Sequence, residues 1–102
     1  STKPRQITPE IIIAHTAELF GLDVEQVKGR SRTRNLVHAR QVAMYVCREL
    51  TDLSYPQIGR EFGDRDHTTV IHAYEKVAKL MQEKQETYDD VTALIQTLLA
   101  ER

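Results

Sequence analysis

The sequence predicts an all-α fold, a compact helical domain of about six helices that contains a helix-turn-helix. Apolar residues recur with the 3.6-residue period of a helix, and no stretch alternates apolar and polar residues over the length of a strand. Helix start and stop signals divide this pattern into segments. At 102 residues, with 40% apolar and 28% charged residues, the chain fits one small globular domain.

The first two expected helices begin at recognisable caps. Thr8 is the expected N-cap of the first helix, with Pro9 at its first position and Gly21 at its end. Asp23 and Gln26 have the spacing of a capping box and start a short second helix. We therefore expect the domain to occupy residues 8–102. Residues 1–7 are polar and contain a proline, so they read as a linker remnant from a longer chain.

A basic loop, KGRSRTRN at residues 28–35, interrupts the helical pattern. Residues 28–40 hold five basic residues and no acid. The net charge of −1 hides this asymmetry, since residues 1–48 carry eight basic and four acidic residues (+4) and residues 49–102 carry six and eleven (−5). A local cationic field can therefore persist in a chain of nearly neutral total charge.

The third expected helix, residues 36–51, has two faces when about 100° of rotation is assigned to each residue. One narrow sector faces a core and holds Ala39, Ala43, Val46 and Leu50. The roughly opposite sector forms a polar, cationic face and holds Arg40, Gln41 and Arg48. This second sector is a candidate surface for a polyanion.

A helix-turn-helix is expected across residues 54–84, where a short helix, a glycine-containing turn and a longer helix follow one another. Ser54 and Gln57 form a second capping box, Gly63 ends the short helix, and Asp66 caps the longer one. The N-terminal residues of a recognition helix reach base edges in the major groove. The candidates for that role are Asp66, His67, Thr68 and Thr69. The alternative for Asp66 is an N-cap alone, worth about 1 kcal/mol, and the alternative for the three residues after it is a merely solvated first turn.

The last expected helix, residues 87–101, carries an apolar stripe. Its members are Tyr88, Val91, Ile95 and Leu98. If these side chains pack inward they complete the core. If they are exposed, the chain is instead a helical protein-interaction module that binds through this face.

The sequence favours a binding module over an enzyme. His67 and His72 are five residues apart and diverge by about 140° around a helix, so they do not form a metal pair. Cys47, the only cysteine, lies beside the apolar stripe of its helix and is expected to pack as a small hydrophobe. No phosphate-binding glycine motif occurs. We predict no catalytic residue, no metal site and no cofactor for this chain, and a reducing, cytoplasmic location.

Three arginines of the basic loop, Arg30, Arg32 and Arg34, alternate with small polar residues. Beside a major-groove helix, such a segment is similar to the arms that enter an adjacent, electronegative minor groove. Alone, it would be a solvated charge run. DNA binding through these elements also suits a transcription regulator, which commonly dimerises on palindromic half-sites.

The segment DRDHTTVIHA, residues 64–73, resembles the signature of the C-terminal DNA-binding domain (domain IV) of the DnaA family of bacterial replication initiators. ARQVAMYVCRELT (residues 39–51), SYPQIGREFG (residues 54–63) and the basic loop are similar to their counterparts in order and spacing. The resemblance therefore covers nearly the whole chain. Asp64 stands where the family usually has glycine, so Gly63 is expected to carry any left-handed conformation alone.

The resemblance implies sequence-specific binding of double-stranded DNA, one monomer per DnaA box, a short asymmetric site of the TTATCCACA type at the replication origin. The implied base contacts are Asp66, His67, Thr68 and Thr69 in the major groove and Arg32 in the minor groove. The implied phosphate-backbone contacts are Arg30, Arg34, Arg40, Gln41, Arg48, Pro56 and Arg65. His38 stands where the family often has an arginine.

Members of this family also carry an ATPase domain that assembles on origin DNA. ATP is therefore expected only for the full-length protein and not as a cofactor of this chain. An acidic phospholipid contact is a further expectation for the full-length protein, and the resemblance leaves open whether residues 45–53 take part in it.

Overall fold

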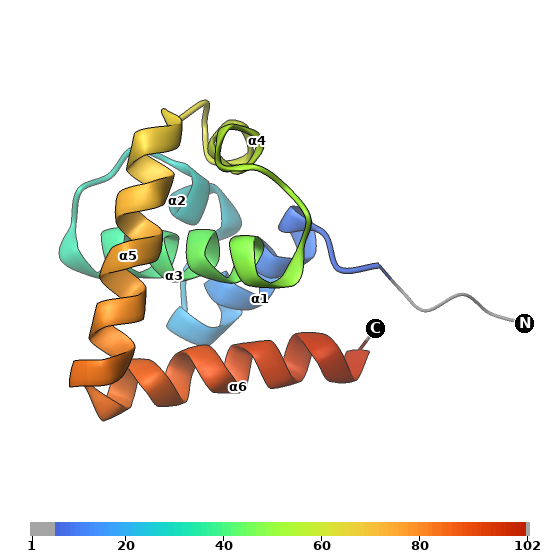
Figure 1. The fold of residues 1–102 in the computed structure, drawn as a ribbon, viewed down its shortest axis with the longest axis vertical. Coiled ribbons are helices and arrows are strands. Elements are labelled where there is room, and N and C mark those ends of the chain that lie inside the picture. Colours follow the sequence, from blue (N-terminus) through green and yellow to red (C-terminus); the bar gives the residue numbers. More distant parts are fainter. Residues whose placement is uncertain (1–5, 102) are drawn as a thin grey trace, which may run out of the picture.

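The computed structural model describes residues 6–101, which form six α-helices and no strand (Figure 1). The helices are α1 (Pro9–Phe20), α2 (Val24–Lys28), α3 (Arg34–Leu50), α4 (Tyr55–Glu61), α5 (His67–Glu83) and α6 (Gln85–Glu101). The predicted all-α class is confirmed. Residues 1–5 of the predicted linker and residue 102 lie outside the described residues.

Helix α3 forms the centre of the domain and packs against each of the other five helices. In Figure 1 it crosses the middle of the molecule, α5 runs along one side, and α6 lies across one end. The core-facing residues Ala39, Ala43 and Val46 are fully buried, whereas Leu50 is half-buried. Cys47 is also buried, which confirms its packing role. Burial raises the pKa of the Cys47 thiol to about 12, so the thiol is not a nucleophile at neutral pH.

The helix starts follow the caps that the sequence predicts. The Thr8 hydroxyl accepts a hydrogen bond from the Ile11 backbone N–H at 3.3 Å, and Gly21 ends α1 in the left-handed conformation. In the α4 capping box the backbone N–H of Ser54 donates to Gln57 Oε1 at 2.8 Å, and the backbone N–H of Gln57 donates to Ser54 Oγ at 3.2 Å. These short-range bonds fix where the helices begin.

The non-helical part of the basic loop is shorter than predicted. Helix α3 begins at Arg34 after Thr33, two residues before the expected start, and α2 extends to Lys28. Only residues 29–33 of the basic loop are therefore non-helical. The Val37 backbone N–H donates to the Thr33 oxygen at 2.9 Å, and this bond closes a first turn that includes Arg34 and Asn35.

The buried stripe of α6 agrees with the predicted one at Val91 and Leu98 and differs at the other two positions, since Ile95 is only half-buried. Tyr88 is 47% exposed and the neighbouring Thr87 is 5% exposed, so the prediction for Tyr88 is wrong. The stripe runs instead through Thr87, Val91, Leu94 and Leu98. Both series have helical spacing, and the positions of α1 and α5 decide which one turns inward. Because Val91 and Leu98 are buried, the face proposed for an interaction module is not available.

The turn between α4 and α5 contains two left-handed residues, Gly63 with φ 73° and Asp64 with φ 57°. The prediction that Gly63 alone adopts this conformation is wrong, because aspartate tolerates it better than most residues. Gly59 lies where the turn folds back on α4. A Cβ on Gly59 would be 2.2 Å from the backbone oxygen of Arg65, so the close approach requires glycine there.

None of the helices in residues 6–101 has the length and apolar composition that a membrane crossing needs. All six helices contribute side chains to one hydrophobic core, and Ile12, Phe62 and Val70 are among its fully buried members. Val70 and Phe62 belong to the two halves of the helix-turn-helix. Their burial anchors that motif to the rest of the domain.

Candidate nucleic-acid interface

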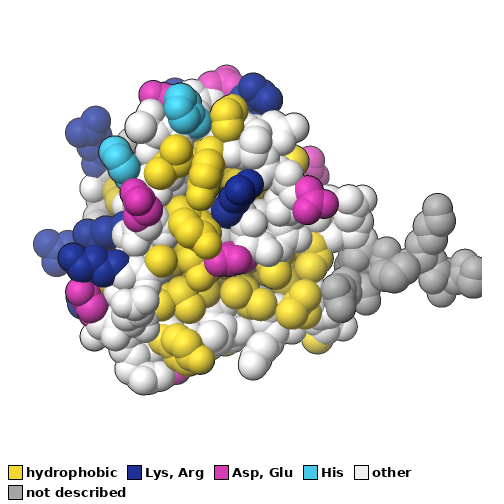
Figure 2. All heavy atoms as spheres, in the orientation of Figure 1, with side chains coloured by type: hydrophobic (Ala, Val, Ile, Leu, Met, Phe, Trp, Pro, Cys, Tyr) yellow, Lys and Arg dark blue, Asp and Glu magenta, His cyan; other side chains and the backbone are white. Residues whose placement is uncertain are grey.

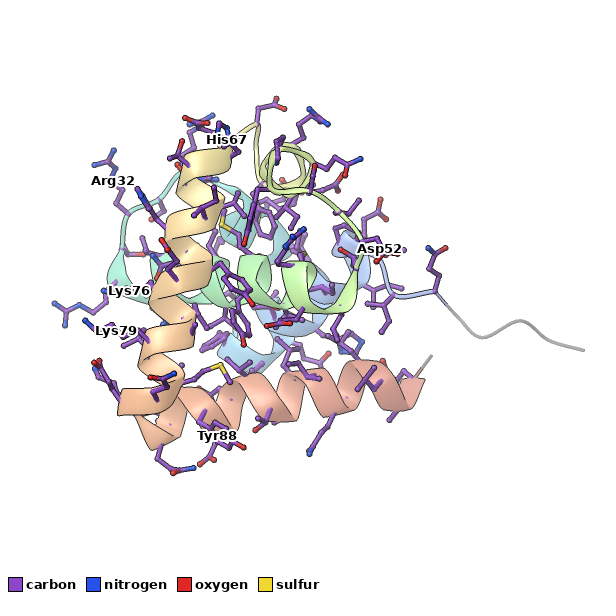
Figure 3. All side chains as sticks on the ribbon, in the orientation of Figure 1. Arg32, Asp52, His67, Lys76, Lys79 and Tyr88 are labelled. Atoms are coloured by element: carbon purple, nitrogen blue, oxygen red, sulfur yellow. The ribbon has the colours of Figure 1, made fainter. Side chains whose placement is uncertain are left out.

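The first turn of α5 protrudes from one end of the domain with polar side chains outward. Figure 3 shows His67 at the free end of α5. The four candidate base-contacting residues, Asp66, His67, Thr68 and Thr69, are all exposed. The next residue, Val70, is fully buried, and Ala73 and Val77 continue the buried side of the helix. The structure therefore presents these polar groups on a helix fixed in the core.

The carboxylate of Asp66 caps α5, as predicted. It accepts a 3.4 Å hydrogen bond from the Thr68 backbone N–H at Oδ1 and a 2.9 Å bond from the Thr68 hydroxyl at Oδ2. His67 Nδ1 lies 2.9 Å from Asp66 Oδ1. The bonds from Thr68, and then the nearby His67, lower the pKa of the Asp66 carboxyl. At neutral pH this group is ionised and offers only acceptors to a ligand.

Arg32 lies in the basic loop beside α5, and its side chain points away from the domain (Figure 3). The side chain is exposed, and no hydrogen bond or ion pair to a described residue holds its guanidinium. Figure 2 shows several Lys and Arg side chains, with acidic side chains among them, along the edge of the molecule that α5 and this loop share. Two chain segments far apart in sequence thus form one cationic edge next to the polar end of α5.

Arg40 is not on an exposed face. It is 5% exposed, so the prediction of a solvent-facing Arg40 is wrong. Its Nε donates to the Val27 oxygen at 2.7 Å, its Nη2 to the Gln26 oxygen at 3.0 Å, and its Nη1 to the Ser31 oxygen at 3.0 Å. Near the end of α2 the Gln26 oxygen also accepts from the Gly29 backbone N–H, and the guanidinium from α3 supplies donors to it and to the Val27 oxygen. The angular position of Arg40 on α3 does not reveal that the end of α2 and the basic loop pack against it.

Arg65 and Arg30 also donate to backbone carbonyls. The two Nη atoms of Arg65 bond the oxygens of Lys28, Gly29 and Phe62. Arg30 Nη2 donates to the Gly63 oxygen at 2.9 Å. Each arginine therefore links the basic loop to the turn of the helix-turn-helix.

The remaining predicted phosphate contacts are accessible. Arg34, Arg48 and Pro56 are exposed, and Gln41 is half-buried. Arg48 Nη1 donates to the Leu53 oxygen at 2.9 Å, and its guanidinium carbon lies 4.6 Å from the centre of the Tyr55 ring. This cation–π contact holds the Arg48 charge at the surface near the start of α4.

A groove of about 1080 Å³ lies between the start of α3, the second half of α5 and the start of α6. Its cationic lining consists of Arg32, Arg34, Lys76 and Lys84. A smaller hollow of about 200 Å³ adjoins Gln41, Thr69 and His72. The sequence pattern did not assign His72 and Lys76 to DNA contacts, although both fall on the helical face of Thr69 at steps of three and four residues.

His38 is half-buried at the packed side of α3 and makes an edge contact with the Phe20 ring, with 5.5 Å between centroids. Burial is the main cause that lowers the pKa of His38, and Lys84 adds to it, while Asp90 and Glu86 act in the opposite direction. His38 is therefore mostly uncharged at neutral pH. Among residues 6–101 no group of three or more His, Cys, Asp or Glu side chains is arranged to hold a metal ion.

The chain matches known proteins over most of its length. The family described as "Bacterial dnaA protein helix-turn-helix" matches residues 9–77, which include α1 to α4 and the first part of α5. The chain is 53% identical over 92 residues to the chromosomal replication initiator protein DnaA of Corynebacterium aurimucosum, which covers 90% of this chain and 17% of that protein. It is 52% identical over 88 residues to the DnaA of Cutibacterium acnes, which covers 86% of this chain and 18% of that protein.

The chain thus spans less than a fifth of the length of these two relatives. The matched region contains the complete turn between α4 and α5 and the polar first turn of α5. The family is described as a helix-turn-helix, and the structure has that arrangement at α4 and α5. The chain belongs to the bacterial DnaA helix-turn-helix family.

Proposed function

We propose that residues 8–102 bind double-stranded DNA at DnaA boxes, and that this binding places a replication initiator at the chromosomal origin. One observation carries the proposal. The polar first turn of α5 and the neighbouring Arg32, whose guanidinium has no intramolecular bond to a described residue, are both exposed. Polar groups at a helix start suit the major groove, and an extended arginine suits the minor groove. Family membership and the names of the two relatives support the same function.

In the major groove, we assign Asp66, His67, Thr68 and Thr69 to base contacts. The ionised Asp66 carboxylate can accept a hydrogen bond from a cytosine amino group. His67 and Thr68 can contact thymine methyl groups or adenine edges. Each such contact is worth about 1 to 3 kcal/mol of discrimination against a wrong base.

In the minor groove, we assign the base contact to Arg32. The narrow minor groove of A·T-rich DNA has an enhanced negative potential that attracts an inserted arginine. Arg32 is free to enter because no described residue holds its guanidinium. Its neighbours in the loop are fixed by hydrogen bonds, so the loop itself does not need to fold on binding.

The phosphate backbone is assigned to the accessible groups Arg34, Gln41, Arg48 and Pro56, with His72 and Lys76 added from the face of α5 that continues from Thr69. The same role for Arg30, Arg40 and Arg65 stays a prediction from the sequence. We leave these three out of the proposal because their guanidinium groups bond carbonyls of segments distant in the sequence, whereas Arg48 bonds only the nearby Leu53 oxygen and stays exposed.

One recognition helix per chain and an asymmetric site favour a single monomer on each box rather than a dimer on a palindrome. This separates the proposal from a dimeric transcription regulator. The chain needs no catalytic residue or cofactor for this function. ATP binding and assembly on origin DNA are proposed only for a longer protein that contains further domains.

The test is a fluorescence-anisotropy titration of a labelled duplex that contains TTATCCACA, beside a scrambled duplex of the same composition, at several salt concentrations. We expect tighter binding to the box by about a thousandfold or more, because specific sites exceed non-specific DNA by that order. Affinity for both duplexes should fall as salt rises. Equal affinity for the two duplexes would reject sequence-specific binding.

A further inference from the structure

Three arginines fix the backbone of the basic loop and leave the side chain of Arg32 free. We propose that Arg65, assisted by Arg30 and Arg40, is a positioning residue that sets the offset between the minor-groove arginine and the recognition helix α5. The inference rests on the proposed DNA-binding function and extends it. It names the groups that make the two groove contacts act as one unit.

Arg65 stands directly before Asp66, the N-cap of α5. Its Nη1 donates to the Phe62 oxygen at 2.6 Å and to the Lys28 oxygen at 3.3 Å, and its Nη2 donates to the Gly29 oxygen at 2.7 Å. One planar guanidinium thus joins the end of α4, the end of α2 and the first residue of the irregular segment. The fixed fork of donors makes this geometry specific to arginine.

Arg30 makes the reverse connection, from the basic loop to the turn. Its Nη2 donates to the Gly63 oxygen at 2.9 Å. The two segments also lie in direct contact, since a Cβ on Gly63 would be 3.2 Å from the Lys28 oxygen. The loop and the turn are therefore bonded in both directions, although they are more than thirty residues apart in sequence.

Arg40 holds the middle of the irregular segment. Its Nη1 donates to the Ser31 oxygen at 3.0 Å, and its remaining bonds fix the last turn of α2 through Val27 and Gln26. Ser31 directly precedes Arg32. The backbone is thus held at Gly29 by Arg65 and at Ser31 by Arg40, and the first side chain beyond these anchors is the one assigned to the minor groove.

This arrangement has a consequence for DNA recognition. A flexible loop would lose conformational freedom when Arg32 enters the groove, which would offset part of the contact energy. A loop fixed in advance avoids that loss and allows only one spacing between the two groove contacts. The contribution of Arg32 to affinity should therefore depend on Arg65, whereas a contact made by α5 alone should not.

A double-mutant cycle tests this dependence in anisotropy titrations with the box duplex. Arg65→Lys keeps the charge but cannot bond three carbonyls as a fork. In the wild type we expect Arg32→Ala to weaken box binding about tenfold or more, and in the Arg65→Lys background by about threefold or less. Thr69→Ala should weaken binding by the same factor in both backgrounds. Arg60→Lys, the same substitution on the exposed side of α4, should leave the Arg32 effect unchanged.

Arg30→Lys supplies a second variant that does not depend on the stability of Arg65→Lys, because Arg30 is exposed and makes one hydrogen bond. It should also reduce the Arg32 effect. Duplexes with one base pair inserted between the two contacted segments give an independent measurement. The wild type should lose most of its affinity for the lengthened site, and the Arg65→Lys protein should lose less.

The outcomes separate the inference from the function on which it rests. If the wild type prefers the box but Arg32→Ala weakens binding equally in all backgrounds, or has no effect in the wild type, the positioning role is rejected and DNA binding stands. If the wild type does not distinguish the box from the scrambled duplex, the proposed function itself is rejected.

Discussion

Asp66 combines two roles in one carboxylate, as the N-cap of α5 and as the proposed acceptor for a base. Its oxygens already bond the Thr68 backbone N–H and hydroxyl, and the side chain remains exposed. A carboxylate oxygen can accept more than one hydrogen bond. The cap and the base contact are therefore compatible in the same conformation.

Two substitutions at Asp66 separate these roles. Asp66→Asn should keep helix stability within about 0.5 kcal/mol, because asparagine caps helices about as well as aspartate. It should nevertheless change the base preference, since an amide offers a donor as well as an acceptor. Asp66→Ala should lose about 1 kcal/mol of stability and relax the preference. Urea unfolding and a panel of boxes with single base changes measure both effects, and an unaltered base profile in both variants would contradict base reading by Asp66.

His38 predicts a pH dependence of stability. Burial favours its neutral form, so its pKa in the folded protein lies below its ordinary value. The unfolded chain then binds more protons than the folded one between the folded pKa and about 6.5. The stabilising contribution is fully present above about pH 6.5 and is lost as pH falls from there through the folded pKa.

His38→Phe removes the titrating group and keeps an aromatic ring against Phe20. The difference in unfolding free energy between wild type and His38→Phe should shift in favour of the variant as pH falls below about 6.5. Thermal unfolding from about pH 5 to about pH 8 measures this difference across the titration range of histidine. A difference that is constant over the whole range would show that His38 protonation does not oppose folding.

Arg40 and Arg48 lie on the same helix, α3, and the structure gives them different roles. Arg40 is buried and bonded to carbonyls of α2 and the basic loop, whereas Arg48 is exposed. The sequence of a helix predicts the angle between two of its side chains. It does not predict which of the two contacts another helix or loop. The two arginines therefore form a matched pair for an experiment.

Arg40→Ala should destabilise the protein by about 1 to 3 kcal/mol, because it leaves the Val27 carbonyl without its buried partner. Arg48→Ala should change stability by about 1 kcal/mol or less, since an exposed arginine contributes mainly through its cation–π contact. It should reduce the slope of log affinity against log salt by about 0.9, the contribution of one phosphate contact. The opposite pairing of effects would restore Arg40 as the phosphate contact.

The turn between α4 and α5 depends on a close approach of two backbones. Gly59→Ala would place a Cβ 2.2 Å from the Arg65 oxygen, so the turn must shift. We expect a loss of about 1 to 3 kcal/mol in unfolding free energy and weaker box binding. Gly21→Ala is the control, because a Cβ there meets no atom within 4 Å and the cost comes only from the left-handed backbone. It should leave box affinity unchanged, and an equal loss of affinity in both variants would contradict a local role of Gly59.

The uneven charge of the whole molecule explains how a chain with a net charge of −1 can bind a polyanion. Lys and Arg side chains gather along the edge formed by α5 and the basic loop, with some acidic side chains among them (Figure 2), and the first turn of α6, which holds Glu86, lies at the far end of α5 from His67 (Figure 1). The cationic edge attracts DNA locally, and the acidic end disfavours other orientations.

A single cationic edge with one recognition helix predicts a complex of one chain and one box. Sedimentation analysis should give the mass of a monomer for the free protein and a 1:1 stoichiometry with a duplex that contains one box. A duplex with two separated boxes should bind two chains. A stable dimer in the absence of DNA, with preference for a palindrome, would favour the mode of a dimeric regulator.

The sequence by itself determined the all-α class, the helix-turn-helix and the caps at Thr8, Ser54 and Asp66. These features depend on hydrogen bonds between residues three or four positions apart and on the period of apolar residues. Both can be read from residues that are close together in the sequence. It also singled out the polar first turn of α5 and Arg32. The distinctive segment at residues 64–73 is enough to recognise the family, because its run of residue types is long and specific.

Only the tertiary structure decided which arginines have an exposed guanidinium without an intramolecular bond to a described residue and which donate hydrogen bonds to backbone carbonyls of other segments. Arg32 and Arg30 are two residues apart in the same loop, yet one is unheld and the other bonds Gly63. The same holds for the first turn of α6, where Thr87 rather than Tyr88 is buried. The physical reason is that a guanidinium or an apolar stripe has several acceptable surroundings, and the distant carbonyls and helices that the fold brings near it select one of them.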